Sequence, residues 1–211
     1  MTRQEDKQIA IPLPESQAAL EGVFVRGEGE EPGGAVVAPP HPLYGGSMDS
    51  PVVAELCWAC KRAGYATVRF NWRGVGASAG TPSGDAGDAD TDYGVALDYL
   101  AETVAGPLVA AGYSFGAATA LRTARSNPRV RRLLLVAPPP SLLDAEALAA
   151  FRGRALALVG EEDAMAPAAE LATLFSGEKR WLEVIPAADH FFGVGLAEIG
   201  RRAGSWLGAD A

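Results

Sequence analysis

Cysteine and histidine are scarce in this chain, which has two of each among 211 residues. The cysteines, Cys57 and Cys60, are three positions apart, whereas a secreted fold stapled by disulfides would have more cysteines at wider spacing. The chain also lacks an apolar run of about 18 residues, the length that spans a bilayer. Its first sixteen residues mix charges with two prolines and do not form the apolar stretch of a secretory signal. We therefore expect a soluble, cytoplasmic protein.

Basic residues are outnumbered by acidic ones. The 18 lysines and arginines and 26 aspartates and glutamates give a formal net charge of −8 and a pI near 4.8. This balance argues against nucleic acid or an anionic membrane surface as the main partner. We expect a small-molecule substrate instead, and the oligomeric state stays open between monomer and homodimer.

The length predicts a single domain over residues 1–211, with residues 1–17 as a loosely ordered N-terminal segment. Short β-rich runs alternate with helical stretches. Continuous apolar runs in this order indicate a parallel sheet with helices on both faces. Ligands bind outside the carboxyl ends of the strands in such sheets, so the residues after each strand matter most. The sheet of about seven strands is predicted to contain Leu20–Arg26, Ala35–Ala38, Ala66–Phe70, Pro107–Ala111, Val130–Ala137, Arg154–Val159 and Trp181–Ile185. The predicted helices are Val52–Arg62, a helix around Tyr93–Thr103, Phe115–Ser126, Pro167–Phe175 and Leu196–Leu207.

The strongest functional signal is the segment Gly112-Tyr113-Ser114-Phe115-Gly116, which follows one predicted strand and leads directly into a helix. A serine on such a sharp turn is held in a strained, exposed conformation, and the flanking glycines remove side chains that would collide with the backbone. The N–H groups at the start of the helix face a developing negative charge. Ser114 is therefore the candidate nucleophile.

A nucleophilic serine requires a base. His190 lies just past the last predicted strand, where a loop at the strand end could carry it over the sheet. The other histidine, His41, lies in a loop after an early strand, and we interpret it as a residue that braces this loop.

The base in turn requires an acid that holds its tautomer. Three acids follow the penultimate strand, and Asp163 is favoured because a short acid just before the helix that Pro167 opens can point back over the strand ends. Glu161 and Glu162 are expected on the solvated face. Asp189 adjoins the histidine, but neighbours in a loop seldom point at each other.

Two backbone N–H groups should bind the oxyanion. The first is that of Phe115, the residue after the nucleophile. The second should come from the loop after the early strand. Pro42 has no N–H, so Leu43 is the favoured donor and Tyr44 the second choice.

These segments together resemble the α/β-hydrolase superfamily, within it a small bacterial branch without a lid domain that is dienelactone-hydrolase- or esterase-like. The resemblance extends from about Leu20 to Leu207. It implies an α/β-hydrolase fold with Ser114 as nucleophile, Asp163 as acid and His190 as base, in the chain order typical of that superfamily. It implies no substrate. The segments that carry it are His41–Met48, Arg69–Ser78, Gly112–Ala117, Val136–Pro139, Gly160–Pro167 and Asp189–Phe192.

Three other motifs are given structural interpretations. Gly74–Ser78 lacks the third glycine and the lysine of a phosphate loop and is expected to be a turn. The acids from Asp85 to Asp92 lack the glycine and glutamate of a calcium loop and fit the start of a helix. Cys57 and Cys60 lie within a helix, not at its N-terminus, where a thiolate would be stabilised.

The residues thus predict a hydrolase that cleaves an ester or thioester through an acyl-enzyme, with no metal or organic cofactor. The tract Pro138–Phe151 is too short for a lid domain, and its leucines Leu142, Leu143 and Leu148 are predicted to wall an acyl pocket. The alternatives are cleavage of an amide, as in aminopeptidase relatives, transfer of the acyl group to another acceptor, or a non-catalytic binding module on the same fold.

Overall fold

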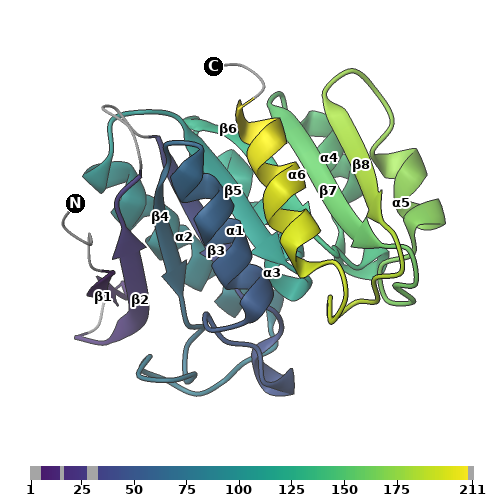
Figure 1. Cartoon of the computed structure of the whole chain (residues 1–211). Coiled ribbons are helices and arrows are strands. Elements are labelled where there is room, and N and C mark those ends of the chain that lie inside the picture. Colours follow the sequence, from purple (N-terminus) through teal and green to yellow (C-terminus); the bar gives the residue numbers. More distant parts are fainter. Residues whose placement is uncertain (1–5, 15–16, 28–32, 209–211) are drawn as a thin grey trace.

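The computed structural model describes residues 6–14, 17–27 and 33–208, which form one eight-stranded sheet in the order β1-β2-β4-β3-β5-β6-β7-β8 (Figure 1). The strands are β1 (Lys7–Pro12), β2 (Ala19–Val25), β3 (Gly34–Ala38), β4 (Ala66–Phe70), β5 (Leu108–Tyr113), β6 (Val130–Val136), β7 (Arg154–Gly160) and β8 (Arg180–Ile185). Strands β1, β2 and β4 pair antiparallel, and all other pairs are parallel. The predicted parallel sheet is confirmed, with one strand more than expected.

The additional strand, β1, corrects the expectation of a loosely ordered N-terminal segment. Residues 1–5 and 15–16 lie outside the described residues, but Lys7–Pro12 pairs with β2 along its whole length. Ile11 is fully buried and Ile9 partly buried, while Gln8 and Ala10 are exposed. This alternation is that of a strand with one covered face, and the charges and prolines around it obscured it in the sequence.

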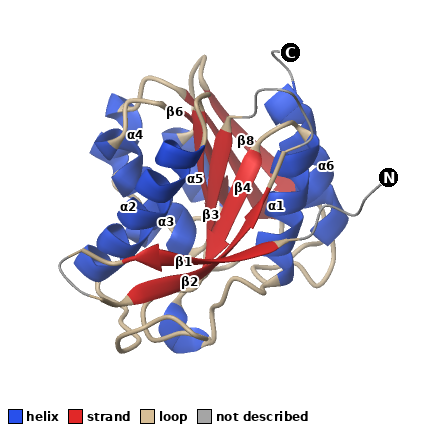
Figure 2. Ribbon diagram, turned by 90° about the vertical axis from the view of Figure 1, so that its left-hand side faces the viewer, coloured by secondary structure: helices blue, strands red, loops and turns tan. Residues whose placement is uncertain are grey.

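Helices cover both faces of the sheet. Figure 2 shows α1 (Pro51–Arg62) and α6 (Leu196–Gly208) on one side. The other side carries α2 (Ala86–Thr103), α3 (Phe115–Thr123), α4 (Ala145–Ala150) and α5 (Ala168–Leu174). Helix α2 begins earlier than predicted because the side chain of Asp85 accepts hydrogen bonds from the N–H groups of Gly87 and Asp88 and so caps it. Of the described helices, none is long and apolar enough to cross a membrane.

The central strands are buried on both faces, and every residue of β3 and β5 is buried. This burial explains why they are continuous apolar runs in the sequence. Because β5, β7 and β8 run parallel, their carboxyl ends meet at the lower edge in Figure 1. The connection from β6 to β7 carries only a short 3-10 turn (Pro140–Leu142) and α4, so the described chain has no lid domain there.

Candidate active site

Ser114 occupies the turn between β5 and α3, as the sequence predicts. Its backbone has φ 54° and ψ −117°, a left-handed region that a residue with a side chain rarely adopts. A Cβ on Gly112 would lie 2.3 Å from the carbonyl oxygen of Gly116, and a Cβ on Gly116 would lie 2.4 Å from that of Pro39. Only glycine at both positions lets strand, turn and helix approach closely enough to present the serine.

The structure brings Ser114, His190 and Asp163 together. His190 Nε2 lies 2.9 Å from Ser114 Oγ, and His190 Nδ1 lies 2.8 Å from Asp163 Oδ2. All three side chains are buried, and they follow β5, β7 and β8 at the same sheet edge. An unbroken path for a proton therefore leads from the serine hydroxyl to the imidazole, with a carboxylate behind it.

Asp163 is held in place by backbone donors. Its Oδ1 accepts hydrogen bonds from the N–H groups of Met165 and Ala166, each 2.8 Å long. The same oxygen lies 3.0 Å from His190 Nδ1. The carboxylate thus has three partners, which fix the side chain that orients the imidazole.

The three alternative acids have other positions. Glu161 Oε2 accepts a hydrogen bond from the N–H of Ala187, and Asp189 Oδ1 accepts one from the N–H of Phe191. Glu162 is exposed. The geometry therefore places a carboxylate from only one of the candidate acids against the histidine ring.

Tyr113 also belongs to this site, although the sequence did not predict it. Its hydroxyl donates a 2.8 Å hydrogen bond to the carbonyl of His190. Burial, followed by the charges of Asp163 and Asp189, raises the pKa of Tyr113 to about 12. The hydroxyl therefore stays protonated and holds the histidine loop. Its position directly before Ser114 was the only signal available in the sequence.

The three backbone N–H groups predicted to bind the oxyanion differ in the acceptors to which they are hydrogen-bonded. Phe115 is the first residue of α3, so its N–H has no acceptor within the helix. The N–H of Leu43 donates to His41 Nδ1 at 3.2 Å, and that of Tyr44 donates to the His41 carbonyl. The His41 ring also lies 4.6 Å from the Phe115 ring, and burial lowers its pKa. His41 braces this loop, because its ring accepts a hydrogen bond from Leu43 and its carbonyl accepts one from Tyr44.

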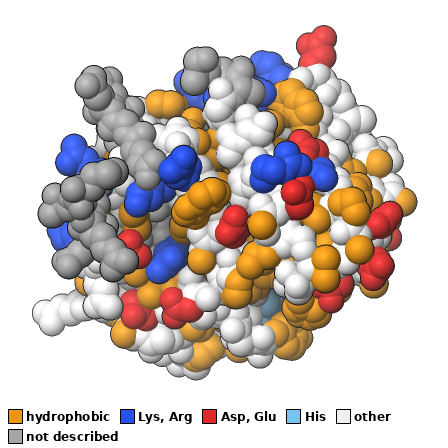
Figure 3. Space-filling model, in the orientation of Figure 1, with side chains coloured by type: hydrophobic (Ala, Val, Ile, Leu, Met, Phe, Trp, Pro, Cys, Tyr) orange, Lys and Arg blue, Asp and Glu red, His pale blue; other side chains and the backbone are white. Residues whose placement is uncertain are grey.

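A cavity of about 700 Å³ opens beside the serine. Tyr44, Met165 and Phe191 line it and are exposed to solvent. On the face drawn in Figure 3, a histidine is visible between hydrophobic side chains near the lower edge, and both histidines of the chain line the cavity. The full lining is Pro40, His41, Tyr44, Gly45, Gly46, Ser50, Pro51, Val52, Tyr113, Ser114, Met165, His190 and Phe191.

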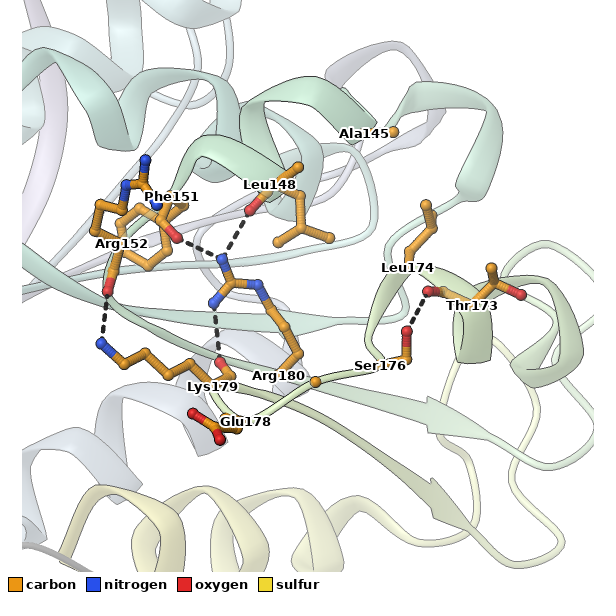
Figure 4. Close-up of a pocket in the computed structure, with 12 residues that line it drawn as sticks. Ala145, Leu148, Phe151, Arg152, Thr173, Leu174, Ser176, Glu178, Lys179 and Arg180 are labelled. Carbon is orange, nitrogen blue, oxygen red and sulfur yellow. Dashed lines mark hydrogen bonds between the residues drawn. The ribbon is translucent and has the colours of Figure 1, made fainter.

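The prediction that Leu142, Leu143 and Leu148 form the wall of an acyl pocket is wrong, because none of them lines this cavity. Leu142 is exposed, Leu143 packs against the core, and Leu148 is buried in α4. Leu148 borders a separate pocket, where Arg180 donates to its carbonyl (Figure 4). The chain turns at Ala137, which has φ 45°, and leads to α4 on the α3 side of the sheet. Leu143 and Leu148 therefore pack on the core, Leu142 faces solvent, and none of the three lines the cavity beside the serine.

The segment after β4 holds the loop that carries His41. Trp72 is buried, and its indole N–H donates to the carbonyls of Pro40, at 2.9 Å, and Pro39, at 3.3 Å. Asn71 Oδ1 accepts a hydrogen bond from the N–H of Met48. The role of these two residues could not be predicted from the sequence, because their partners lie 32 and 23 positions away in the chain.

The remaining motifs have structural roles. Gly74 adopts φ 70° in a turn, as predicted. Asp85 caps α2, and both Asp88 and Asp92 bind Arg73. Within the described residues, no group of three or more histidines, cysteines and acids could hold a metal ion.

The cysteines are free and buried in α1. Burial raises the thiol pKa of Cys57 to about 12 and also raises that of Cys60. Neither thiol is therefore activated as a nucleophile.

The sheet order, the helices on both faces and a serine presented at the carboxyl edge together define an α/β-hydrolase fold. The chain belongs to the alpha/beta hydrolase family, whose sequence model matches residues 35–209. An uncharacterized protein of Rickettsia prowazekii is 29% identical over 203 residues, which cover 90% of this chain and 85% of that protein.

Two solved structures are similar over nearly the whole chain. An alpha-beta serine hydrolase homologue from Coxiella burnetii has a TM-score of 0.80 and 29% identity, with 98% of each chain covered. A serine hydrolase without a lid from Xanthomonas campestris has a TM-score of 0.82 and 25% identity, with coverage of 100% of this chain and 96% of that one.

Proposed function

We propose that the protein is a serine hydrolase that cleaves a carboxylic ester or thioester through an acyl-enzyme on Ser114. The observation that carries this proposal is the line of hydrogen bonds from Ser114 Oγ to His190 Nε2, at 2.9 Å, and from His190 Nδ1 to Asp163, at 2.8 Å. This line ends at a cavity large enough for a small substrate.

In the first half-reaction, Ser114 Oγ attacks the carbonyl carbon while His190 Nε2 takes the hydroxyl proton. Asp163 stabilises the imidazolium that forms. The N–H groups of Phe115 and Leu43 bind the oxyanion. The Leu43 N–H must first break its hydrogen bond to His41 Nδ1. Collapse of the tetrahedral intermediate breaks the bond to the alkoxide or thiolate, which takes the proton from His190.

The second half-reaction repeats these steps with water. His190 accepts a proton from the water as its oxygen attacks the acyl-enzyme carbonyl, and Ser114 Oγ leaves with that proton. The carboxylic acid is released and the enzyme regains its initial state. The similarity to the serine hydrolase homologue from Coxiella burnetii and to the lidless serine hydrolase from Xanthomonas campestris supports this assignment.

The test is covalent labelling. A fluorophosphonate, followed by mass spectrometry, should place one adduct on Ser114, and Ser114→Ala should remove the adduct and lower kcat by about a million-fold. Ser176→Ala, at an exposed serine bonded to the Thr173 carbonyl, is the matched control and should label normally. A binding module would leave Ser114 unmodified and would hydrolyse no ester.

A substrate panel separates the remaining chemistries. 4-Nitrophenyl esters, acyl thioesters and aminoacyl amides should be compared by kcat/KM, with the products identified in each case. We expect ester or thioester cleavage to exceed amide cleavage. A faster rate with an added alcohol or amine acceptor would instead identify an acyltransferase.

A further inference from the structure

We infer that the substrate is uncharged in the part that occupies the cavity beside Ser114, so that the enzyme prefers neutral esters with an apolar group to esters that carry a carboxylate or phosphate. This inference rests on the proposed hydrolase function and adds a substrate class to it.

The first support is the absence of formal charge in the cavity wall. Among the described residues that line it, none is lysine, arginine, aspartate or glutamate. Three large side chains at its surface, Tyr44, Met165 and Phe191, are 87%, 54% and 73% exposed. An apolar group bound there would remove this surface from water, which is favourable at about 25 cal/mol per Å².

The second support is that the polar groups of the wall are already engaged or neutral. Ser114 and His190 are bonded to each other, and the Tyr113 hydroxyl donates to the His190 carbonyl. Burial lowers the pKa of His41, whose Nδ1 accepts the Leu43 N–H. A carboxylate in the cavity would lose its water without gaining a cationic partner, which is costly.

The third support is the sign of the charges next to the wall. Asp189 adjoins His190 and is exposed, and its charge contributes to the raised pKa of Tyr113. Asp49 is exposed beside Ser50. Both carboxylates oppose an anion at the cavity mouth.

One feature acts in the opposite direction. Helix α1 begins at the cavity, and a helix N-terminus attracts anions. Its first residue is Pro51, which has no N–H, so one of the donors usual at a helix N-terminus is missing. The positive end of α3, in contrast, faces the position of the transient oxyanion. For the permanent charge of a substrate anion, the cavity offers this helix end but no cationic side chain among the described lining residues.

Matched esters test the inference. 4-Nitrophenyl hexanoate and the 4-nitrophenyl half-ester of adipic acid have the same leaving group and chain length, and differ by a terminal carboxylate. We expect kcat/KM for the hexanoate to be higher by about 100-fold. The neutral adipamate ester controls for polarity without charge and should exceed the adipate. Adipate turnover within about three-fold of hexanoate turnover would overturn the inference.

Met165 offers a gain-of-function variant at the cavity mouth. Met165→Lys supplies the missing cation and should raise the adipate-to-hexanoate ratio of kcat/KM by about 10-fold. Met165→Gln, similar in length but uncharged, should leave that ratio unchanged. An unaltered ratio in the lysine variant would show that charge does not decide specificity here.

Labelling by an uncharged fluorophosphonate shows whether the inferred substrate class or the hydrolase function itself is wrong. If Ser114 is labelled but the adipate ester is preferred, the substrate class is wrong and the hydrolase function stands. If Ser114 is not labelled and neither ester is cleaved, the hydrolase function itself is wrong.

Discussion

The substitution Asp163→Asn isolates the contribution of the carboxylate because the structure dictates how the amide would sit. Asp163 Oδ1 accepts the N–H groups of Met165 and Ala166, so the amide oxygen should stay there. The NH₂ group then takes the place of Oδ2, which is 2.8 Å from His190 Nδ1. An NH₂ group only donates. His190 would have to leave Nδ1 unprotonated and carry its proton on Nε2, facing Ser114.

A histidine in that tautomer cannot accept the serine proton, and the imidazolium has also lost its counter-charge. We expect kcat to fall by about 10⁴-fold, the size typical of this change in a serine triad, or about 5 kcal/mol in the barrier. The measurement is steady-state hydrolysis of a 4-nitrophenyl ester. The rate of fluorophosphonate labelling, which also needs the serine as nucleophile, should fall in parallel.

Measurements of unfolding distinguish the loss of imidazole orientation from misfolding of the variant. Asp163→Asn keeps the two backbone hydrogen bonds and should unfold near the wild-type temperature. Asp163→Ala leaves the N–H groups of Met165 and Ala166 without this acceptor, which should cost about 1–3 kcal/mol for each. Glu162→Gln, at the exposed neighbouring acid, is the control and should keep wild-type kcat. If Asp163→Asn retained more than about a tenth of kcat, or if the glutamate variant lost as much, the orienting role would be refuted.

Two further predictions concern the supporting structure. Trp72→Phe removes the donor to the Pro40 carbonyl, so urea unfolding should report a loss of about 1–3 kcal/mol and kcat/KM should fall by about 10-fold because the His41 loop is less well held. Because burial raises the thiol pKa of Cys57 to about 12 and also raises that of Cys60, both stay protonated, and iodoacetamide should alkylate neither in the folded protein at mildly alkaline pH.

Each of these has a clear counter-result. Wild-type stability in the phenylalanine variant would mean that the indole hydrogen bond does not anchor the loop. Prompt alkylation under native conditions, at the rate seen in denaturant, would mean that the cysteine face of α1 opens freely to solvent.

The residues that sequence reasoning missed share a property. Tyr113 bonds to a carbonyl 77 positions away, and Trp72 bonds to one 32 positions away. Nothing in the local pattern of an aromatic residue identifies such a partner. Leu143 and Leu148 were misplaced for the same reason, since an apolar side chain signals burial but not the neighbour against which it is buried, and Leu142 is exposed. Strand β1 was missed because its alternation is short and surrounded by charged residues and prolines.

What the sequence determined by itself is local. The apolar runs require buried parallel strands, and two glycines around Ser114 allow a strained strand-to-helix turn that no bulkier residues could form. Tertiary structure decided which acid contacts His190, which residues hold the loops around Ser114, and what surrounds the cavity. Those features arise where segments distant in the chain converge at one edge of the sheet, and their geometry is set by packing that no single segment encodes.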